Sequence, residues 1–503
     1  MIFGDWIGRW GQTFPQGEAV YDAITDRRYT YGDLSREVNR LARFLSEGLG
    51  VEKGDRVSCL SLNRAEYITL FFATSRLGAV LVPLNFRLAA AEFDYFLQDA
   101  GPKVLFHDAE HETIALELRH RFNSVSFVRF GDGPDGPSPW AALSDQAPPE
   151  VEIAADDPQL IIYTSGTTGL PKGVILTHGM IEANAVNTVL GWDLSSRDRT
   201  ILHAAMFYTA GWNVFTLPLF LTRASNILVK SFDPDLILDL IEKEKVTVFF
   251  GVPTMYRMLI DSPRFERADF SSLRFMVSGG AALGRDIFDI FKERKGVHLW
   301  EGYGLTEVGP NNFIADGKLG TLGHVMPGVD IRLVDQDGRD VPRGREGQIL
   351  LRGRHMCAGY WNKPEATAES IKDGWFQTGD LGRVDEDGHY IIAGRLKDMI
   401  ISGGVNIYPA EIERVVEAHP DVVGAAIIGV PDPKWGEVGK AVVELRPGAS
   451  LDLAGLNAFL IERLGRFKLP KHLTVVETLP RTPASGKIQK FLLKKEHGRA
   501  DDD

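Results

Sequence analysis

The sequence predicts a multi-domain α/β protein, with a large amino-terminal region of two α/β subdomains and a small antiparallel β-barrel, followed by a smaller α+β domain. Three observations predict this class. Strand-like and helix-like patterns alternate over residues 29–85 and again over 104–252, which is typical of a largely parallel sheet. From 320 to 395, short apolar segments are separated by glycine turns. Beyond about 395, helix and strand patterns form a compact mixture.

The elements of the amino-terminal region are expected from their periodicity. A helix is expected to open within 29–34 and to continue at helical spacing over 36–49, and a second helix is expected over 65–77. These helices alternate with strand-like runs over 56–62 and 79–83. Further apolar runs, over 160–163, 174–177 and 246–250, are expected as strands. The segment around 130–137 is rich in glycine and proline, which predicts an exposed turn.

Two Asp-Gly pairs indicate hairpins in the later part of this region. Asp337-Gly338 follows the strand-like run 330–334, and Asp387-Gly388 precedes the run 389–392. The segment 394–398 is the candidate domain boundary, so we expect domains over 1–395 and 396–503. In the second domain, helices are expected over 410–418 and 452–464, and strands over 422–430, 440–445 and 472–478.

Composition excludes several classes of protein. The 503 residues suggest about three domains. A net charge of −12 argues against general nucleic-acid binding, which needs a basic surface. Cys59 and Cys357 lack metal-ligand spacing, which favours structural thiols in a reducing compartment. The start of the chain does not resemble a signal peptide, and the longest apolar runs are too short for a membrane span, so a cytoplasmic protein is expected.

The most informative segment is 163–173, which concentrates glycines, hydroxyl side chains and one lysine. Glycines let a backbone approach a ligand closely, successive amides bind anions, and Lys172 adds a positive charge. This composition predicts a triphosphate site, although the spacing is not that of the Walker A loop. The alternative is a surface turn or linker, which the apolar runs on both sides disfavour. The candidate phosphate ligands are Thr164, Ser165, Gly166, Thr167, Thr168, Gly169 and Lys172.

Four more segments are candidates for the same site. In 300–307, Gly302 and Gly304 leave room for the ring of Tyr303 over a ligand, while Thr306 and Glu307 offer the oxygens that Mg²⁺ prefers. In 375–382, Asp380 could accept both hydroxyls of a ribose. The others are 394–404 and 486–490. Each segment alone is also compatible with an ordinary turn or a solvated basic patch.

Together and in this order, the segments resemble the adenylate-forming (ANL) superfamily, which includes acyl-CoA synthetases, luciferases and peptide-synthetase adenylation domains. The resemblance extends from about residue 20 to about residue 495 and implies a mobile carboxyl-terminal domain. It also implies that ATP and, for a synthetase, coenzyme A are cosubstrates, and that Mg²⁺ is the cofactor. No protein nucleophile is then needed, because such an enzyme mainly orients and stabilises its substrates.

The resemblance also implies a role for each motif residue. Residues 164–173 would hold the β- and γ-phosphates, and Thr306 and Glu307 would serve the α-phosphate and Mg²⁺. Tyr303 would stack on adenine, and Asp380, assisted by Arg395, would bind the ribose. Lys487 would bridge the substrate carboxylate and the α-phosphate. The remaining assignments are Lys397 as the hinge, Gly280 and Ala281 beside the nucleotide, and Ser402, Gly403 and Gly404 near the pantetheine arm of coenzyme A.

Two positions depart from the family pattern. Between Pro480 and Gly486 the chain is one residue longer than the common motif, which affects the reach of Lys487. Many acyl- and aryl-CoA synthetases carry histidine where Tyr208 stands. Tyr208 also lacks the carboxylate with which amino-acid-activating domains pair the substrate ammonium. The acid pocket is therefore expected to be uncharged, with Phe207, Tyr208, Trp212 and Val252 as candidates, although plain core packing is the alternative for some of them.

The leading hypothesis is an ATP-dependent acyl-CoA synthetase that forms acyl-AMP with release of pyrophosphate and then the coenzyme A thioester. Medium-chain fatty acids are the first expectation for the substrate, and aryl or arylpropenoic acids the second. An enzyme that delivers the acyl group to a carrier protein, a luciferase and a non-catalytic relative are the alternatives. The intact set Lys172, Glu307, Asp380, Arg395 and Lys487 argues against the last. A small-molecule acid is the expected partner, and the oligomeric state is left open, a homodimer included.

Overall fold

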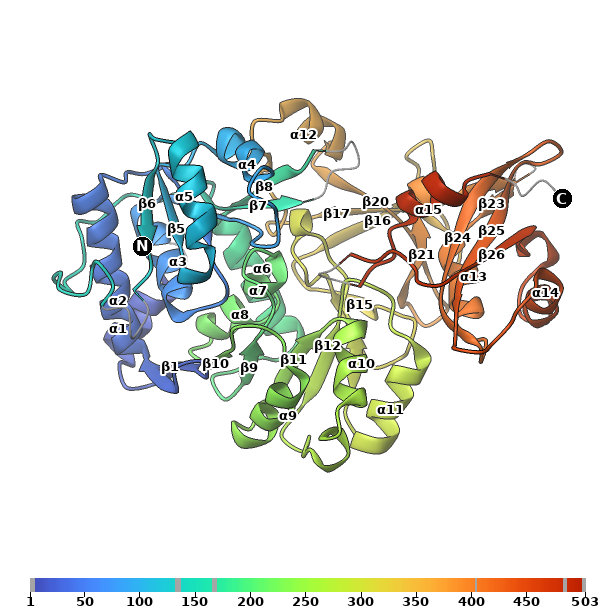
Figure 1. Ribbon diagram of the computed structural model, residues 1–503, viewed down its shortest axis with the longest axis horizontal. Helices are drawn as coiled ribbons and strands as arrows, with labels where there is room; N and C mark the ends of the chain where they lie inside the picture. The colour runs from blue at the N-terminus through green and yellow to red at the C-terminus, as the bar shows by residue number, and fades with distance from the viewer. Residues whose placement is uncertain (1–4, 132–136, 165–169, 403–404, 483–485, 500–503) are drawn as a thin grey trace.

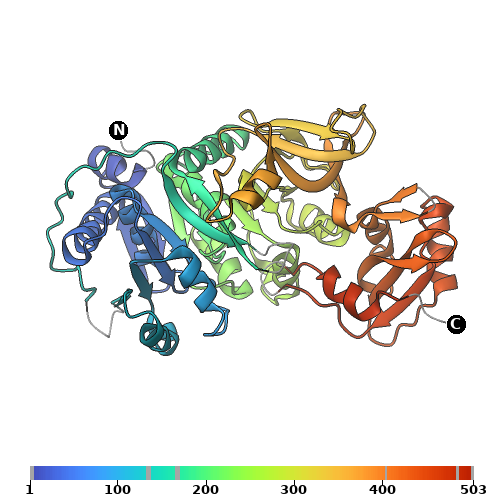
Figure 2. The same cartoon turned by 90° about the horizontal axis from the view of Figure 1, so that it is seen from above.

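The computed structural model describes residues 5–131, 137–164, 170–402, 405–482 and 486–499. Figures 1 and 2 show an elongated molecule whose carboxyl-terminal part, in orange and red, lies at one end. The amino-terminal elements, in blue, lie at the other end, and the green and yellow segments lie between them. Among the described residues, none of the helices combines the length and the apolar character that a bilayer span requires.

The largest sheet has seven strands and forms the predicted α/β core. Its order is β18-β8-β7-β4-β3-β5-β6. The strands are β3 (Arg56–Leu60), β4 (Val80–Pro83), β5 (Val104–His107), β6 (Ser126–Arg129), β7 (Pro158–Thr164), β8 (Lys172–Thr177) and β18 (Gly359–Tyr360). The pairs from β7 through β4, β3 and β5 to β6 are parallel, as predicted, whereas β7–β8 and β8–β18 are antiparallel.

Helix α3 (Ala65–Leu77) is the central helix of this core. All its residues except Glu66 are buried, and it ends at Gly78 with φ +64°, a left-handed cap that glycine adopts without strain. Helix α2 (Tyr31–Arg43) packs against α3 and begins with a capping box between Thr30 and Asp33. The other helices of this part are α1 (Trp6–Thr13), α4 (Phe93–Ala100), α5 (Glu112–Arg121) and α6 (His178–Gly191).

Two smaller sheets complete the α/β region. A four-stranded sheet has the order β2-β1-β10-β9, and a parallel three-stranded sheet has the order β11-β12-β13. Their strands are β1 (Glu18–Asp22), β2 (Arg27–Thr30), β9 (Arg199–Leu202), β10 (Ser225–Leu228), β11 (Val248–Gly251), β12 (Phe275–Ser278) and β13 (Leu299–Glu301). The helices nearby are α7 (Thr209–Asn213), α8 (Thr216–Leu221), α9 (Pro234–Lys243), α10 (Pro253–Asp261) and α11 (Arg285–Lys295).

The antiparallel unit predicted for 320–395 is a five-stranded sheet with both expected Asp-Gly turns. Gly338 (φ +78°) and Gly388 (φ +91°) both lie in the left-handed region. The second turn joins β20 to β21, and the first follows β16 and lies before β17, which begins at Gly347. The strands are β16 (Asp330–Val334), β17 (Gly347–Arg352), β19 (Ile371–Lys372), β20 (Trp375–Val384) and β21 (Tyr390–Arg395). The hairpin β14 (Phe313–Ile314) and β15 (His324–Val325) precedes them, and α12 (Pro364–Ser370) precedes β19.

The carboxyl-terminal unit is an α+β arrangement with its own hydrophobic core. Its sheet has the order β23-β22-β25-β24, with β26 paired to β25. The strands are β22 (Ile400–Ser402), β23 (Val405–Ile407), β24 (Val422–Asp432), β25 (Gly436–Leu445) and β26 (His472–Val476). The helices are α13 (Pro409–Val416), α14 (Leu453–Ile461) and α15 (Lys490–His497), and residues such as Ile412, Ile427 and Leu456 fill the core.

Candidate active site

The three parallel strands β11, β12 and β13 end side by side in glycine-rich segments. The N–H of Gly302 donates to the carbonyl of Ser278 at 2.7 Å, and that of Gly279 donates to Gly251 at 3.1 Å. A side chain on Gly304 would overlap the backbone of Gly309 and Pro310, so glycine is required there. Ligands of α/β proteins bind beyond such carboxyl ends. The predicted residues at this edge are Gly280, Ala281, Gly302, Tyr303 and Gly304.

Tyr303, Asp380 and Arg395 form one hydrogen-bonded group. The Tyr303 hydroxyl donates to Oδ2 of Asp380 at 2.6 Å, and Nε of Arg395 lies 3.1 Å from Oδ1. Asp380 and Arg395 are direct partners in the β20–β21 pair, which fixes their side chains next to each other. Burial and the adjacent carboxylate raise the pKa of Tyr303 well above its usual value, so this phenol stays a donor. The hydrogen bond to Asp380 therefore fixes the hydroxyl end of the Tyr303 ring.

A second group joins Glu307, Tyr360 and Lys172. The Tyr360 hydroxyl donates to Oε1 of Glu307 at 3.0 Å, and Nζ of Lys172 lies 5.0 Å from the centre of the Tyr360 ring. Burial raises the pKa of Glu307, while the hydrogen bond from Tyr360 and the charge of Lys172 oppose that shift. Thr306 begins the short 3-10 helix that carries Glu307. The arrangement therefore gathers a lysine and a carboxylate from distant segments.

The predicted phosphate loop connects two antiparallel strands. Thr164, the last residue of β7, lies directly opposite Lys172, the first residue of β8. Ser165, Gly166, Thr167, Thr168 and Gly169 lie outside the described residues. The N–H of Trp361 donates to Gly173 at 2.7 Å, so the strand β18 that carries Tyr360 is fixed against the end of the loop. The hairpin thus holds Lys172 beside Tyr360.

Lys487 comes from the carboxyl-terminal unit and reaches the same region. The N–H of Thr482 donates to the carbonyl of Lys487 at 2.8 Å. A Cβ on Gly486 (φ +64°) would lie 2.5 Å from Cγ2 of Thr254 in α10, so Gly486 lies against the amino-terminal region. Lys487 remains exposed, but partial desolvation and the charge of Arg395 lower its pKa to about 8. The longer motif therefore still brings Lys487 close to Asp380 and Arg395.

The other predicted residues lie at the junction and in the acid pocket. Lys397 lies in the 3-10 helix Leu396–Asp398 that follows β21, and Ser402 ends β22, whereas Gly403 and Gly404 lie outside the described residues. The ring of Phe207 lies 4.2 Å from that of Tyr208 and 5.0 Å from that of Phe86. Trp212 is fully buried and stacks on Phe71 in the core, and Val252 is buried at the start of α10.

Comparisons with known proteins identify the family to which the chain belongs. A family described as "AMP-binding enzyme" matches residues 7–361, and its "AMP-binding enzyme C-terminal domain" matches 411–487. The chain belongs to the AMP-binding enzyme family. A feruloyl-CoA synthase of Amycolatopsis sp is 42% identical over 98% of this chain and 99% of that protein. The long-chain-fatty-acid–CoA ligase FadD13 of Mycobacterium tuberculosis is 35% identical, with 96% of each chain covered. The ATP-bound crystal structure of MatB from Rhodopseudomonas palustris has a TM-score of 0.90 at 34% identity, covering 98% of this chain and 99% of that one.

This AMP-binding enzyme is an AMP-forming acid–CoA ligase of the acyl- and aryl-CoA synthetase type, and it uses ATP, Mg²⁺ and coenzyme A. The residues present fit the metal, because the half-buried Glu307 carboxylate and the neighbouring Thr306 hydroxyl offer oxygen ligands. Mg²⁺, when bound, neutralises phosphate charge. Lys172 and Lys487 add positive charge from two different parts of the chain.

Sequence reasoning missed one residue of this candidate site, Tyr360. Its hydroxyl donates a hydrogen bond to Glu307, and the ammonium of Lys172 lies over its ring. Tyr360 therefore links two of the predicted site residues. The sequence feature that could have indicated Tyr360 is the run Gly359-Tyr360-Trp361, in which two aromatic residues follow a glycine shortly before Pro364. Gly359 has φ +129°, and a Cβ there would approach Thr367 closely, so glycine is required at the start of β18.

Proposed function

We propose that the acid activated by this synthetase is an aromatic acid with a short side chain, of the arylpropenoic class. The carrying observation is the cluster of Phe86, Phe207 and Tyr208, whose rings contact one another edge to face and at a tilt. Arg87 lies over both phenylalanine rings, 5.4 Å from Phe86 and 5.9 Å from Phe207. Aromatic rings favour such edge and tilted partners, so this cluster suits a planar aryl group.

The comparison with relatives supports the same class. The feruloyl-CoA synthase is more similar to this chain than the fatty-acid ligase, at 42% against 35% identity over nearly complete chains. A medium-chain fatty acid is the second candidate, because Phe207 and Val252 are apolar and the relative FadD13 is named for fatty acids. Delivery to a carrier protein instead of coenzyme A is the third outcome that the experiment below separates.

The proposed roles follow from the two hydrogen-bonded groups. Tyr303 supports the adenine, Asp380 and Arg395 bind the ribose, and Thr164, Lys172 and the segment between them bind the β- and γ-phosphates. Gly280 and Ala281 line the nucleotide side of the pocket, and Thr306 and Glu307 serve Mg²⁺ and the α-phosphate. Lys487 neutralises the charge that develops between the acid and the α-phosphate.

In the first step a carboxylate oxygen of the acid attacks the α-phosphorus, the α–β anhydride bond breaks, and pyrophosphate leaves. In the second step the sulfur of coenzyme A attacks the acyl carbon, AMP leaves, and the thiol proton passes to solvent. Lys487 serves the first step and must move away for the second. We place the domain boundary at 395/396 and the hinge at Lys397, with Ser402 and the two glycines after it approaching the pantetheine arm.

The test measures pyrophosphate release with coumarate, ferulate, benzoate, octanoate and dodecanoate, each with and without coenzyme A. The proposal expects the highest kcat/KM for the arylpropenoic acids and a rise in turnover on addition of coenzyme A. Highest kcat/KM for octanoate or dodecanoate would establish the fatty-acid alternative. Release that ignores coenzyme A would indicate a carrier protein as acceptor. The variant Lys487→Ala is the control for enzyme-dependent release.

A further inference from the structure

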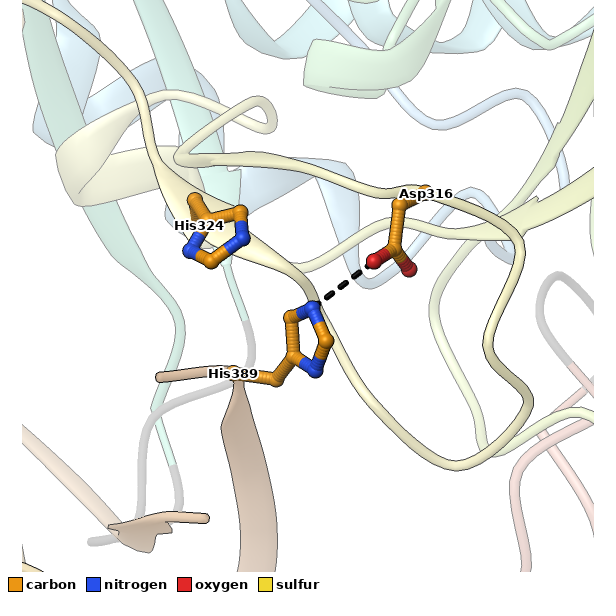
Figure 3. Close-up of side chains that lie close together, drawn as sticks. All are labelled: Asp316, His324 and His389. Carbon is orange, nitrogen blue, oxygen red and sulfur yellow. Dashed lines mark ion pairs between the residues drawn. The ribbon is translucent and has the colours of Figure 1, made fainter. Parts of the chain in front are cut away.

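Two histidines and an aspartate from separate segments meet at the edge of the five-stranded sheet (Figure 3). Asp316 lies between β14 and β15, His324 begins β15, and His389 directly precedes β21. Their ligand atoms all lie within 4.8 Å of one another. Nε2 of His389 is 2.7 Å from Oδ2 of Asp316, and the two imidazole rings are 4.7 Å apart.

Backbone pairing fixes the two histidines next to each other. Gly323 and Tyr390 form an antiparallel bridge, in which the N–H of Tyr390 donates to the Gly323 carbonyl at 3.0 Å. The N–H of Leu322 donates back to the Tyr390 carbonyl at 2.8 Å. His324 and His389 are the neighbours of this bridged pair. A Cβ on Gly323 would overlap the backbone of Ile314, so the local geometry requires glycine.

A carboxylate is held on the far side of the His389 ring. Nδ1 of this buried histidine lies 3.6 Å from Oδ2 of Asp385 and 3.5 Å from Nζ of Lys318. Oδ1 of Asp385 accepts the N–H groups of Asp387 at 3.0 Å and of His389 at 2.9 Å, which holds the carboxylate in place. Histidines that bind metals commonly have a carboxylate facing the other ring nitrogen, because it fixes the ring orientation and raises ligand basicity. This arrangement directs Nε2 of His389 toward Asp316, as Figure 3 shows.

We propose that Asp316, His324 and His389 bind a divalent transition-metal ion such as Zn²⁺. Two imidazole nitrogens and one carboxylate oxygen suit Zn²⁺, Co²⁺ or Ni²⁺, whereas Mg²⁺ and Ca²⁺ prefer oxygen ligands throughout. Metal–ligand bonds of about 2 Å separate ligand atoms by about 3.3 Å, so the ion replaces the direct contact between His389 and Asp316. Asp316 and His324 are exposed, so the remaining coordination position is open to water.

A neighbouring group of carboxylates is a weaker candidate. Asp385, Asp387 and His389 also lie close together, but Nζ of Lys318 is 2.9 Å from Asp385 and 2.7 Å from Asp387. The ammonium already neutralises these carboxylates, and it lies on the Nδ1 side of His389, at 3.5 Å. A metal ion therefore meets less competition from the Lys318 ammonium on the side of His389 that faces Asp316.

The bound ion would join the loop before β15 to the turn between β20 and β21. The same loop carries Gly320, whose N–H donates to Oε1 of Glu301 at 2.5 Å at the end of β13. A Cβ on Gly320 would lie 3.5 Å from Arg414 of α13, so this loop also contacts the carboxyl-terminal unit. The ion is thus a structural clamp beside the contact between the two domains, with no part in the chemistry.

Calorimetric titration of the full-length, nucleotide-free enzyme with ZnCl₂ tests the proposal. We expect one Zn²⁺ per chain, and a Kd at least tenfold higher in His324→Ala and Asp316→Asn. Both replaced side chains are exposed, so these variants should fold, which thermal unfolding in EDTA checks. His120→Ala, an exposed histidine on α5, and Asp387→Asn, from the neighbouring carboxylates, should bind as the wild type does.

Substitution with Co²⁺ provides a second measurement. The wild type should show visible d–d absorption that disappears in His324→Ala and persists in His120→Ala. Absence of stoichiometric Zn²⁺ binding in the wild type would overturn the proposal. Wild-type affinity in His324→Ala, or loss of binding in Asp387→Asn with retention in His324→Ala, would overturn it as well.

Discussion

The phenol of Tyr303 donates a hydrogen bond to the carboxylate of Asp380 at 2.6 Å, and this bond joins the end of β13 to the middle of β20. It therefore connects the parallel sheet to the antiparallel one at the nucleotide site. Nε of Arg395 holds the other oxygen of Asp380, so each of its carboxylate oxygens has a described partner. The proposed adenine and ribose contacts depend on one another through this bond.

Removing this hydroxyl should weaken nucleotide binding. Tyr303→Phe keeps the ring but removes a hydrogen bond to a charged acceptor, which is worth about 1.5–3 kcal/mol. We expect the KM for ATP to rise about tenfold, measured by pyrophosphate release at saturating acid. Tyr21→Phe is the matched control, because it removes a tyrosine–aspartate bond to Asp26, of 2.9 Å, outside the site. Equal KM values in the two variants would contradict the assigned role.

Lys487 should serve adenylation and not thioester formation. In Lys487→Ala we expect the adenylation rate to fall by about 10²–10³, the usual cost of losing one stabilising group in the transition state. Thioester formation from supplied acyl-AMP should stay within about twofold of the wild type, because that step does not use this ammonium. Lys495→Ala, an exposed lysine on α15, should leave both steps unchanged. If both half-reactions fell equally in Lys487→Ala, the role would be wrong.

The pKa of Lys487, lowered to about 8, predicts a pH dependence of the first step. The ammonium is the active form, so adenylation should be fastest below pH 8 and should decline as the pH rises through that value. Lys487→Arg keeps a positive charge at every accessible pH and should remove the alkaline decline, although its absolute rate is lower. The kcat/KM of adenylation between pH 6.5 and 9.5 is the measurement. An identical decline in both proteins would assign the titration to another group.

The junction at Lys397 should matter only for the second step. Proline fixes φ near −65°, so Lys397→Pro should restrict rotation between the domains. We expect acyl-AMP formation at nearly the wild-type rate and a loss of thioester formation of at least tenfold. Lys397→Ala removes the side chain and keeps the backbone free, so it should retain both steps. Comparable losses of both steps in the proline variant would count against a hinge at this residue.

The close approach of Gly486 to Thr254 allows a steric test of whether this contact between the two domains is needed for adenylation. Gly486→Ala places a methyl group about 2.5 Å from Cγ2 of Thr254, so adenylation should fall. Gly448→Ala is the control for backbone strain alone, because Gly448 has φ +79° and open space around it. Adding Thr254→Ala should restore part of the activity of Gly486→Ala. No recovery in the double variant would show that the methyl group acts on the backbone and not on Thr254.

The elements with strong local patterns could be predicted from the sequence. The helix at 65–77, the strands at 56–60 and 80–83, and both Asp-Gly turns occur as expected. Their signals are periodicity and turn chemistry, which act over a few residues. The helix expected to open within 29–34 begins at Tyr31, where Thr30 and Asp33 form the capping box. Over the last part of the range expected to be helical, it continues as a π-helix, Phe44–Gly48.

What the sequence did not predict arises from contacts between distant segments. The addition of β18 to β8 joins residues far apart in sequence, and no local pattern encodes such pairing. Tyr360 enters the site through that pairing. Trp212 is a pocket candidate by its apolar sequence neighbourhood, whereas in the structure it packs on Phe71 in the core. An apolar sequence pattern does not distinguish a pocket wall from the core.

The register of β7 against β8 has a consequence for the energetics of ATP binding. Thr164 and Lys172 are cross-strand partners, so the sheet fixes both ends of the intervening segment before any ligand arrives. Bringing the ends of a free segment together costs conformational entropy, and binding to such a segment is weakened by that amount. In this protein the entropy of bringing the two ends together is lost when the chain folds, before ATP binds. The phosphate contacts proposed for Lys172 should therefore contribute to affinity with little loss from ordering the chain at Thr164 and Lys172.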